Sequence, residues 1–235
     1  PTSDDSQINP FFLTLLGHIT RQASRRNYDV LVSFQQLSDD WLNDYVVSNR
    51  ADGIILLGYG DYGRISDKLQ RLLQEGLYFT IWGATVPELK GHAVGCENTV
   101  GGEMATRHLL NLGRKNIAFV GANTENAPEF KHRYEGFCEA HRDAGVLVNP
   151  NLQVETDNQE LSAFTATQQL IDRDMEFDAI FAASDLIAFG VLKCLKKNGI
   201  KTPEQVAVVG FDDIPAATYF SPSLTTIRQD TRLAA

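Results

Sequence analysis

The sequence predicts an α/β protein of two lobes, each a doubly wound parallel sheet with helices on both faces. One observation is that short runs such as 53–57, 117–120 and 206–209 are apolar throughout, which is typical of strands buried on both faces of a parallel sheet. A second is that these runs alternate with helical patterns. A third is that the alternation occurs twice, with a seam near Gly113. We therefore expect an N-terminal lobe over 1–113, a C-terminal lobe over 114–225 and a crossover back to the N-terminal lobe over 226–235.

The expected elements follow from local patterns along the chain. Asn9-Pro10 is a helix-start signal, and Phe12, Leu15 and Ile19 follow at helical spacing. No apolar strand precedes Ile8, so we expect that the first strand of this lobe is missing from the chain. Strands are expected at 29–34, 53–57, 78–82, 93–96, 117–120, 152–155, 178–182 and 206–209. Helices are expected at 10–26, 39–49, 61–75, 99–112, 129–144, 160–172, 185–198 and 215–219.

The glycines at 58, 60 and 63 match the spacing of a dinucleotide-binding loop. Such a site needs an acidic residue at the end of the next strand to hold the ribose, and that strand ends in Gly83-Ala84-Thr85. Tyr59 and Tyr62 are also bulky for a loop that would press against a pyrophosphate. A flexible loop is favoured over a nucleotide site.

Composition and charge exclude several classes of function. A hydrophobic content of 43% and a charged content of 22% are those of a globular domain, and no stretch is long and apolar enough to span a membrane. The net charge of −9 argues against a nucleic-acid surface on these residues. The three cysteines, Cys96, Cys138 and Cys194, lack a Cys-x-x-Cys spacing and are expected to be reduced thiols in the cytoplasm.

No catalytic or metal-binding motif is present in the sequence. The five histidines are not paired at a spacing of four residues, and none of the usual nucleophile, zinc or phosphate-loop motifs occurs. We therefore expect no enzyme activity, no cofactor and no metal.

Two carboxylates follow the strand at 206–209, where an open α/β sheet places its ligands. Asp212 is the candidate for accepting hydrogen bonds from a ligand. Asp213 is the candidate for capping the helical turn at 215–219, and the reverse assignment stays open.

The stretch VVGFDDI at 208–214, followed by LTTIRQ at 224–229, resembles the LacI/GalR family of bacterial transcription regulators. Other matches follow the family's order along nearly the whole chain. They are NPFF at 9–12, ADGII at 51–55, EN at 97–98, HLLNLG at 108–113, IAFVG at 117–121, RYEGF at 133–137 and AASD at 182–185.

The resemblance implies a two-lobed periplasmic-binding-protein-like fold. It implies the effector-binding and dimerisation core of a cytoplasmic homodimer, whose operator-binding helix-turn-helix head is absent from this chain. A sugar or similar small polar effector is expected in the cleft between the lobes. The alternative is a periplasmic sugar-binding protein of an ABC transporter, and a signal peptide or a helix-turn-helix upstream would separate the two.

The resemblance also implies a set of effector-binding residues: Phe11, Phe12, Arg133, Asn158, Ser184, Asp212 and Gln229. By helical periodicity, Phe12 is on the apolar face that would pack into the core, and Phe11 is off that face. Arg133 is likewise off the apolar face of its own helix. Asn158 stands where relatives often carry an aromatic, and Ser184 where many carry asparagine, so Ser184 could bind a hydroxyl or cap its helix.

Two further expectations concern the surfaces of the protein. Arg133 and Asp212 are expected to point into solvent until an effector is bound. The dimer surface is expected on the outer helices of both lobes, in the first lobe on the helices at 39–49 and 61–74 through Trp41, Tyr45, Ile65 and Leu69.

Overall fold

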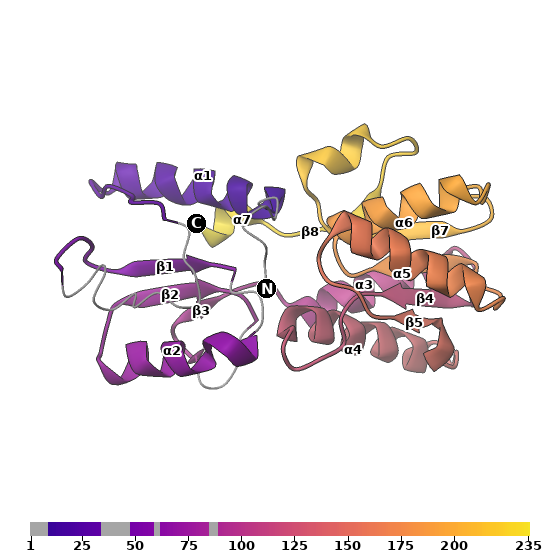
Figure 1. Ribbon diagram of the computed structural model, residues 1–235, viewed down its shortest axis with the longest axis horizontal. Coiled ribbons are helices and arrows are strands. Elements are labelled where there is room, and N and C mark those ends of the chain that lie inside the picture. The colour runs from indigo at the N-terminus through magenta and orange to yellow at the C-terminus, as the bar shows by residue number, and fades with distance from the viewer. Residues whose placement is uncertain (1–8, 34–47, 59–61, 85–88) are drawn as a thin grey trace. The chain divides into compact units, whose positions relative to one another are not determined.

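The computed structural model describes residues 9–33, 48–58, 62–84 and 89–235, which form two compact units. Unit 1 comprises Pro1–Cys96 with Asp230–Ala235, and unit 2 comprises Glu97–Gln229 (Figure 1). Sequence patterns instead suggested a boundary at Gly113. The difference arises because the helix before Gly113, α3 (Asn98–Asn111), packs on α4 (Pro128–Asp143) of unit 2.

Glycines allow α3 and α4 to approach closely. A Cβ at Gly102 would lie 2.2 Å from the carbonyl oxygen of Arg133, and one at Gly136 would lie 2.0 Å from that of Thr99. The second boundary also differs from the expected residue 225, because β8 (Thr225–Arg228) pairs with the sheet of unit 2.

Unit 1 is built on a parallel sheet in the order β1 (Ile54–Leu57), β2 (Phe79–Trp82) and β3 (Ala93–Val94). Figure 1 shows α1 (Pro10–Arg25) and α2 (Tyr62–Gln74) on opposite sides of this sheet. The C-terminal α7 (Thr231–Ala234) lies against α1, where His18 Nδ1 and Thr231 Oγ1 are 3.1 Å apart. These strands and helices confirm the expected alternation.

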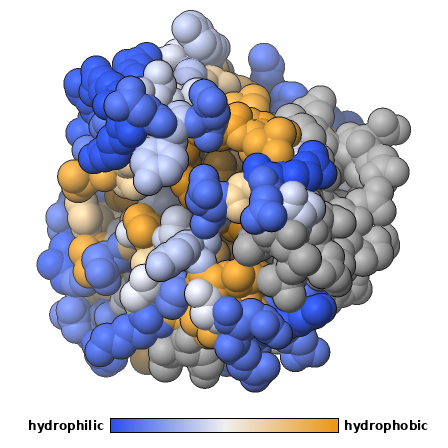
Figure 2. Space-filling view, turned by 90° about the vertical axis from the view of Figure 1, so that its left-hand side faces the viewer, coloured by the Kyte–Doolittle hydropathy of each residue, from blue (hydrophilic) through white to orange (hydrophobic). Residues whose placement is uncertain are grey.

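Two expectations for unit 1 need correction. A strand was expected at 29–34, but the structure assigns residues 29–33 to no strand, and the side chains of Val30, Leu31 and Val32 are exposed. Figure 2, which views the side that is on the left in Figure 1, shows hydrophobic side chains among hydrophilic ones at the surface. Ile65 and Leu69, expected on a dimer surface, are instead buried in the core of unit 1. Most of the expected helix at 39–49, including Trp41 and Tyr45, lies outside the described residues.

Unit 2 is built on a five-stranded parallel sheet in the order β5-β4-β6-β7-β8. Its strands are β4 (Ile117–Val120), β5 (Gln153–Val154), β6 (Ala179–Ala182), β7 (Ala207–Asp212) and β8 (Thr225–Arg228). The chain passes from β4 outward to β5 and then returns to the other side of β4 at β6. This reversal of strand order defines the point of a doubly wound sheet at which ligands bind.

Helices cover both faces of the unit 2 sheet. The pair α3 and α4 lies on one face, and the pair α5 (Glu160–Asp172) and α6 (Asp185–Lys197) lies on the other (Figure 1). The core between them is aromatic: the ring centroid of Phe119 is 5.4 Å from that of Phe181 and 5.7 Å from that of Phe137. A 3-10 helix, η4 (Pro215–Tyr219), joins β7 to β8, and another, η3 (Pro150–Leu152), precedes β5. Within the described ranges, no helix is long and apolar enough to cross a membrane.

Candidate functional site

Five of the seven candidate residues belong to unit 2 and gather at the carboxyl ends of its strands. Ser184 follows β6, Asp212 ends β7, and Gln229 follows β8. Asn158 lies in the loop after β5, and Arg133 reaches the same edge from α4. This edge is where the order of a doubly wound sheet reverses, so the fold itself brings these side chains together.

Arg133 is a buried cation held by three different elements. Its Nε donates to Asn98 Oδ1 at 2.9 Å, and its Nη1 donates to the carbonyl oxygen of Ala183 at 2.5 Å. Its guanidinium carbon also lies 3.7 Å from the ring centroid of Phe211. The side chain is therefore fixed by hydrogen bonds and by an aromatic face.

The placement of Arg133 corrects two expectations. The residue is 4% exposed and lies on the buried face of α4, whereas the sequence suggested that it was off the apolar face and open to solvent. Its partner Asn98 is the first residue of α3, and the Asn98 side-chain oxygen accepts from Arg133. A guanidinium can occupy a core-facing position because its hydrogen bonds and cation–π contact replace water.

Asp212 is also buried, at 7% exposure, and its nearest cation is Arg133, with Nη1 and Oδ1 3.5 Å apart. The same oxygen accepts a hydrogen bond of 2.6 Å from Gln229 Nε2. Burial raises the pKa of Asp212 to about 6, although the Arg133 charge and the Gln229 hydrogen bond lower it. The two charged side chains thus lie side by side in the buried network, and neither is free in solvent as was expected.

The backbone of Asp212 is strained. Its φ is 119°, and that of Asp213 is 54°, in a region that non-glycine residues rarely adopt. Such a conformation costs about 1–3 kcal/mol, and it persists only where surrounding contacts fix it. Strain of this kind is concentrated at functional sites, which supports the assignment of Asp212 to the site.

Asp213 does not cap the following turn. It is exposed, and η4 has no side-chain cap, with Ile214 at its N-cap position. Its backbone N–H donates to Thr226 Oγ1 at 3.4 Å. The capping role expected for Asp213 is therefore wrong.

Ser184 and Asn158 form a polar pair beside this network. Ser184 Oγ accepts from the backbone N–H of Ile187 at 3.2 Å, which caps α6, and donates to Asn158 Oδ1 at 2.5 Å. Ser184 therefore caps its helix, and its hydroxyl proton is donated to a neighbouring side chain of the protein. Because its carbonyl oxygen accepts from Ser184, the Asn158 side chain keeps its amide N–H groups as donors.

Phe11 and Phe12 lie in unit 1, on the first turn of α1. Phe11 is 4% exposed and its ring centroid is 5.6 Å from that of Trp82, while Phe12 is only half-buried. The sequence suggested the reverse, with Phe12 in the core. In the structure the buried face of α1 instead begins at Phe11 and continues at Leu15. A Cβ at Gly58 would lie 2.9 Å from the Phe12 ring, so Phe12 packs on the loop that follows β1.

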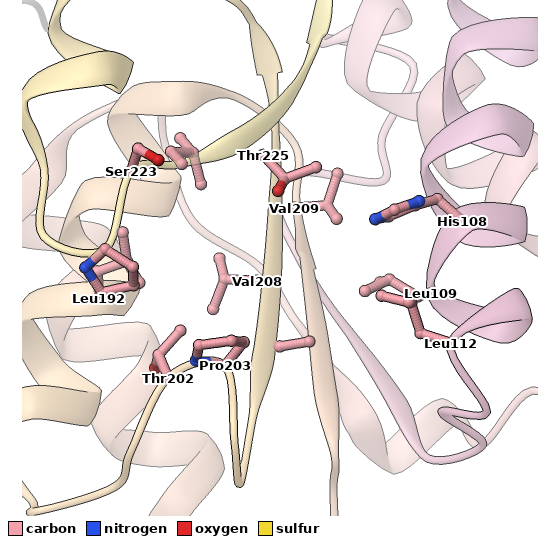
Figure 3. Close-up of a pocket in the computed structure, with 13 residues that line it drawn as sticks. His108, Leu109, Leu112, Leu192, Thr202, Pro203, Val208, Val209, Ser223 and Thr225 are labelled. Atoms are coloured by element: carbon pink, nitrogen blue, oxygen red, sulfur yellow. The ribbon is translucent and has the colours of Figure 1, made fainter.

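One pocket of unit 2 lies away from this network. It has a volume of about 200 Å³ and is lined mostly by aliphatic side chains around the first residues of β7 and β8, as Figure 3 shows. His108 is exposed and points into it. The pocket includes no residue of the Arg133–Asp212 network, and its lining offers no charged carboxylate or guanidinium.

Sequence reasoning missed two further residues of the site. Asp185 is completely buried, and its carboxylate accepts from the backbone N–H of Ile214 at 2.8 Å and from the hydroxyl of Thr226 at 2.5 Å. The two residues, Asp185 and Thr226, lie in the stretches AASD and LTTIRQ, which were recognised. The signal available in the sequence was an aspartate shortly after a buried strand.

Comparison with known proteins places these features in a family. A model described as a periplasmic binding protein-like domain matches residues 106–235. The HTH-type transcriptional regulator CelR of Thermobifida fusca is 30% identical over 95% of this chain and 66% of its own length. The HTH-type transcriptional repressor CytR of Escherichia coli strain K12 is 30% identical over 94% of this chain and 64% of its own length. The chain thus spans about two thirds of these relatives.

Solved structures agree with the sequence relatives. A CelR–cellobiose complex superposes with a TM-score of 0.86 at 29% identity, over 96% of this chain and 69% of that one. A LacI family regulator from Enterococcus faecium with bound ribose has a TM-score of 0.79 at 27% identity, over 97% of this chain and 84% of that one. The expected fold class is therefore confirmed.

Proposed function

Since this chain belongs to the LacI/GalR-type regulators with a periplasmic-binding-protein-like domain, we propose that it is the effector-binding and dimerisation part of a cytoplasmic transcriptional regulator. The effector is a sugar or a similar small polar molecule that binds at the carboxyl edge of the unit 2 sheet. Operator binding resides in a helix-turn-helix segment outside these 235 residues. Effector and operator then change each other's affinity by the same factor.

The observation that carries this proposal is the buried network of Arg133, Asp212 and Gln229. A guanidinium and a carboxylate side by side offer donors and acceptors that match vicinal hydroxyls. The two oxygens of the Asp212 carboxylate differ. Gln229 and Arg133, the partners found among the described residues, both face Oδ1, so Oδ2 can accept from a ligand. Asn158 adds donors at the same edge.

The relatives support a sugar as the class of effector. One structure similar to this chain is a complex with cellobiose and another contains ribose. The departure at Asn158 bears on which sugar is selected, because an amide binds a hydroxyl or ring oxygen rather than covering an apolar sugar face.

Homodimerisation is part of the same proposal. In unit 2, Leu161 of α5 and Tyr219 of η4 are large apolar side chains at the surface. The ring of Phe220 stacks on that of Phe189 of α6, with centroids 4.1 Å apart, and so holds the end of η4 against α6. Apolar side chains at the surface favour association with a second copy. Sedimentation should show a dimer at micromolar concentration, and Tyr219→Asp should shift it toward monomer.

A calorimetric titration tests the effector. The protein is titrated with cellobiose, ribose and glucose, and at least one is expected to bind and to raise the melting temperature. Asp212→Asn should weaken that binding at least tenfold, which corresponds to about 1.4 kcal/mol. A matched control is Asp213→Asn, because Asp213 is the exposed neighbour and should leave the affinity unchanged. Equal affinity in wild type and Asp212→Asn would contradict the proposed site.

A further inference from the structure

The carboxylate of Asp185 lies directly behind the turn that carries Asp212. Its Oδ2 accepts from the backbone N–H of Ile214, and its Oδ1 accepts from the Thr226 hydroxyl. The Thr226 hydroxyl in turn accepts from the backbone N–H of Asp213. One buried carboxylate therefore fixes both peptide groups that follow Asp212, one directly and the other through Thr226.

Strand β7 is shaped to admit this carboxylate. A Cβ at Gly210 would lie 2.4 Å from Asp185 Oδ1, so only glycine leaves room for it at this position. The carboxylate is thus enclosed by Gly210 on one side and by the 213–214 peptide groups on the other. Its place is set by the same strand that ends in Asp212.

A helix-capping role does not account for Asp185. The N-cap of α6 is Ser184, whose side chain accepts from Ile187. The hydrogen bonds of the Asp185 carboxylate go to Ile214 and Thr226, both outside its own helix. Its partners are therefore the turn and strand that frame the site.

We propose that Asp185 is a positioning residue, which holds the 212–214 turn in the strained conformation that directs Asp212 to Arg133 and Gln229. The positive φ angles at 212 and 213 would relax without contacts that fix the following peptide groups. Asp185 supplies these contacts without reaching the ligand. The inference rests on the proposed function only in taking Asp212 as the residue that meets the effector.

The protonation of Asp185 gives a direct readout of this role. Burial raises its pKa to about 7, the charges of Asp212 and Asp213 raise it further, and the hydrogen bonds from Thr226 and Ile214 lower it. A protonated carboxyl has lost an acceptor site, so its bonds to the turn weaken. The backbone amides at 213 and 214 should therefore report the Asp185 titration.

The experiment is a pH titration of the ligand-free, isotopically labelled full chain by NMR. We expect the amide resonance of Ile214, which donates directly to Asp185, to show a step with a midpoint of about 7, separate from the step at about 6 that Asp212 causes. In Asp185→Asn the step at about 7 should disappear, while the Asp212 step remains, and the Asp212 resonance should move at all pH values. An Ile214 step at about 7 that survives in folded Asp185→Asn would overturn the proposal.

A second set of variants keeps the test decisive if Asp185→Asn does not fold. Thr226→Val removes the link to Asp213 and should raise the midpoint, because the Thr226 hydrogen bond lowers the Asp185 pKa. Thr226→Ser keeps the hydroxyl and should restore the wild-type curve. Thr225→Val is the matched control one residue earlier on β8, since Thr225 is exposed and lines the separate pocket. An unchanged curve and unmoved 212–214 resonances in Thr226→Val would count against a positioning role.

Titration with cellobiose, ribose and glucose separates this inference from the proposed function. If wild type binds one of them, Asp185→Asn should weaken binding at least tenfold, and unchanged affinity would refute the positioning role. If none of the three binds, the sugar proposal fails, while the ligand-free NMR titration still decides the role of Asp185.

Discussion

Replacing Arg133 by methionine should destabilise unit 2 strongly. The substitution keeps an unbranched side chain but removes the hydrogen bonds to Asn98 and Ala183, and it leaves Asp212 buried without its cation. Removing one partner of a buried ion pair costs about 3–5 kcal/mol. That is a large share of the total stability of about 5–15 kcal/mol typical of a folded protein.

A double-mutant cycle isolates the pair itself. Asp212→Asn removes the carboxylate charge, so the double variant should be less destabilised than the sum of the single variants, by about 1–3 kcal/mol. Urea unfolding followed by circular dichroism measures both units, whereas fluorescence of Trp82 reports unit 1. Arg142→Met is the matched control, because Arg142 is on the same helix with its side chain 71% exposed, and it should change stability by less than about 0.5 kcal/mol. Additivity of the two single variants within about 0.5 kcal/mol would refute the coupling.

Three other predictions follow from contacts already described. Because the pKa of Asp185 is raised from 3.8 to about 7, its contribution to stability is present at low pH and is lost as pH rises between these values. Asp185→Asn should flatten that decline, by up to about 1.4 kcal/mol per pH unit, in urea unfolding across the same pH window. Ser184→Ala should lower stability by about 1 kcal/mol through loss of the α6 cap, measured by thermal unfolding, and Ser184→Thr should retain most of it. Gly136→Ala should cost about 1–3 kcal/mol or more by forcing α3 from α4, and a wild-type melting temperature would contradict that packing.

Most of the strand and helix order of unit 2 could be predicted from the sequence. Strands β4 and β6 are short apolar runs, and α5 begins and ends where the pattern indicated. Strand β8, which contains two threonines and an arginine, was not expected as a strand. The boundary between the two units could not be predicted in this way, because it depends on which other helix α3 packs against. Close packing of α3 on α4 depends on Gly102 and Gly136. From the sequence alone, a glycine within a helix indicates lower helix stability rather than a close approach of two helices.

The sequence predicted which candidate residues of unit 2 lie close together, but it did not predict their burial. Arg133, Asp212, Ser184, Asn158 and Gln229 do gather at one edge of the unit 2 sheet. That the arginine is buried could not be foreseen, because periodicity counts a charged residue as surface. Its burial depends on partners from three other elements, which are distant in the sequence and meet only in the folded sheet.

The hydrogen bond from Gln229 to Asp212 has a consequence for how the two units are joined. Gln229 is the last residue of unit 2, and Asp230 is the first residue of the returning segment of unit 1. Asp230 Oδ1 accepts from the backbone N–H groups of Arg232 and Leu233 and so caps α7. The side chains on both sides of this peptide bond are thus engaged within their own units. Each side of the crossing is anchored separately, by the pair with Asp212 in unit 2 and by the α7 cap in unit 1.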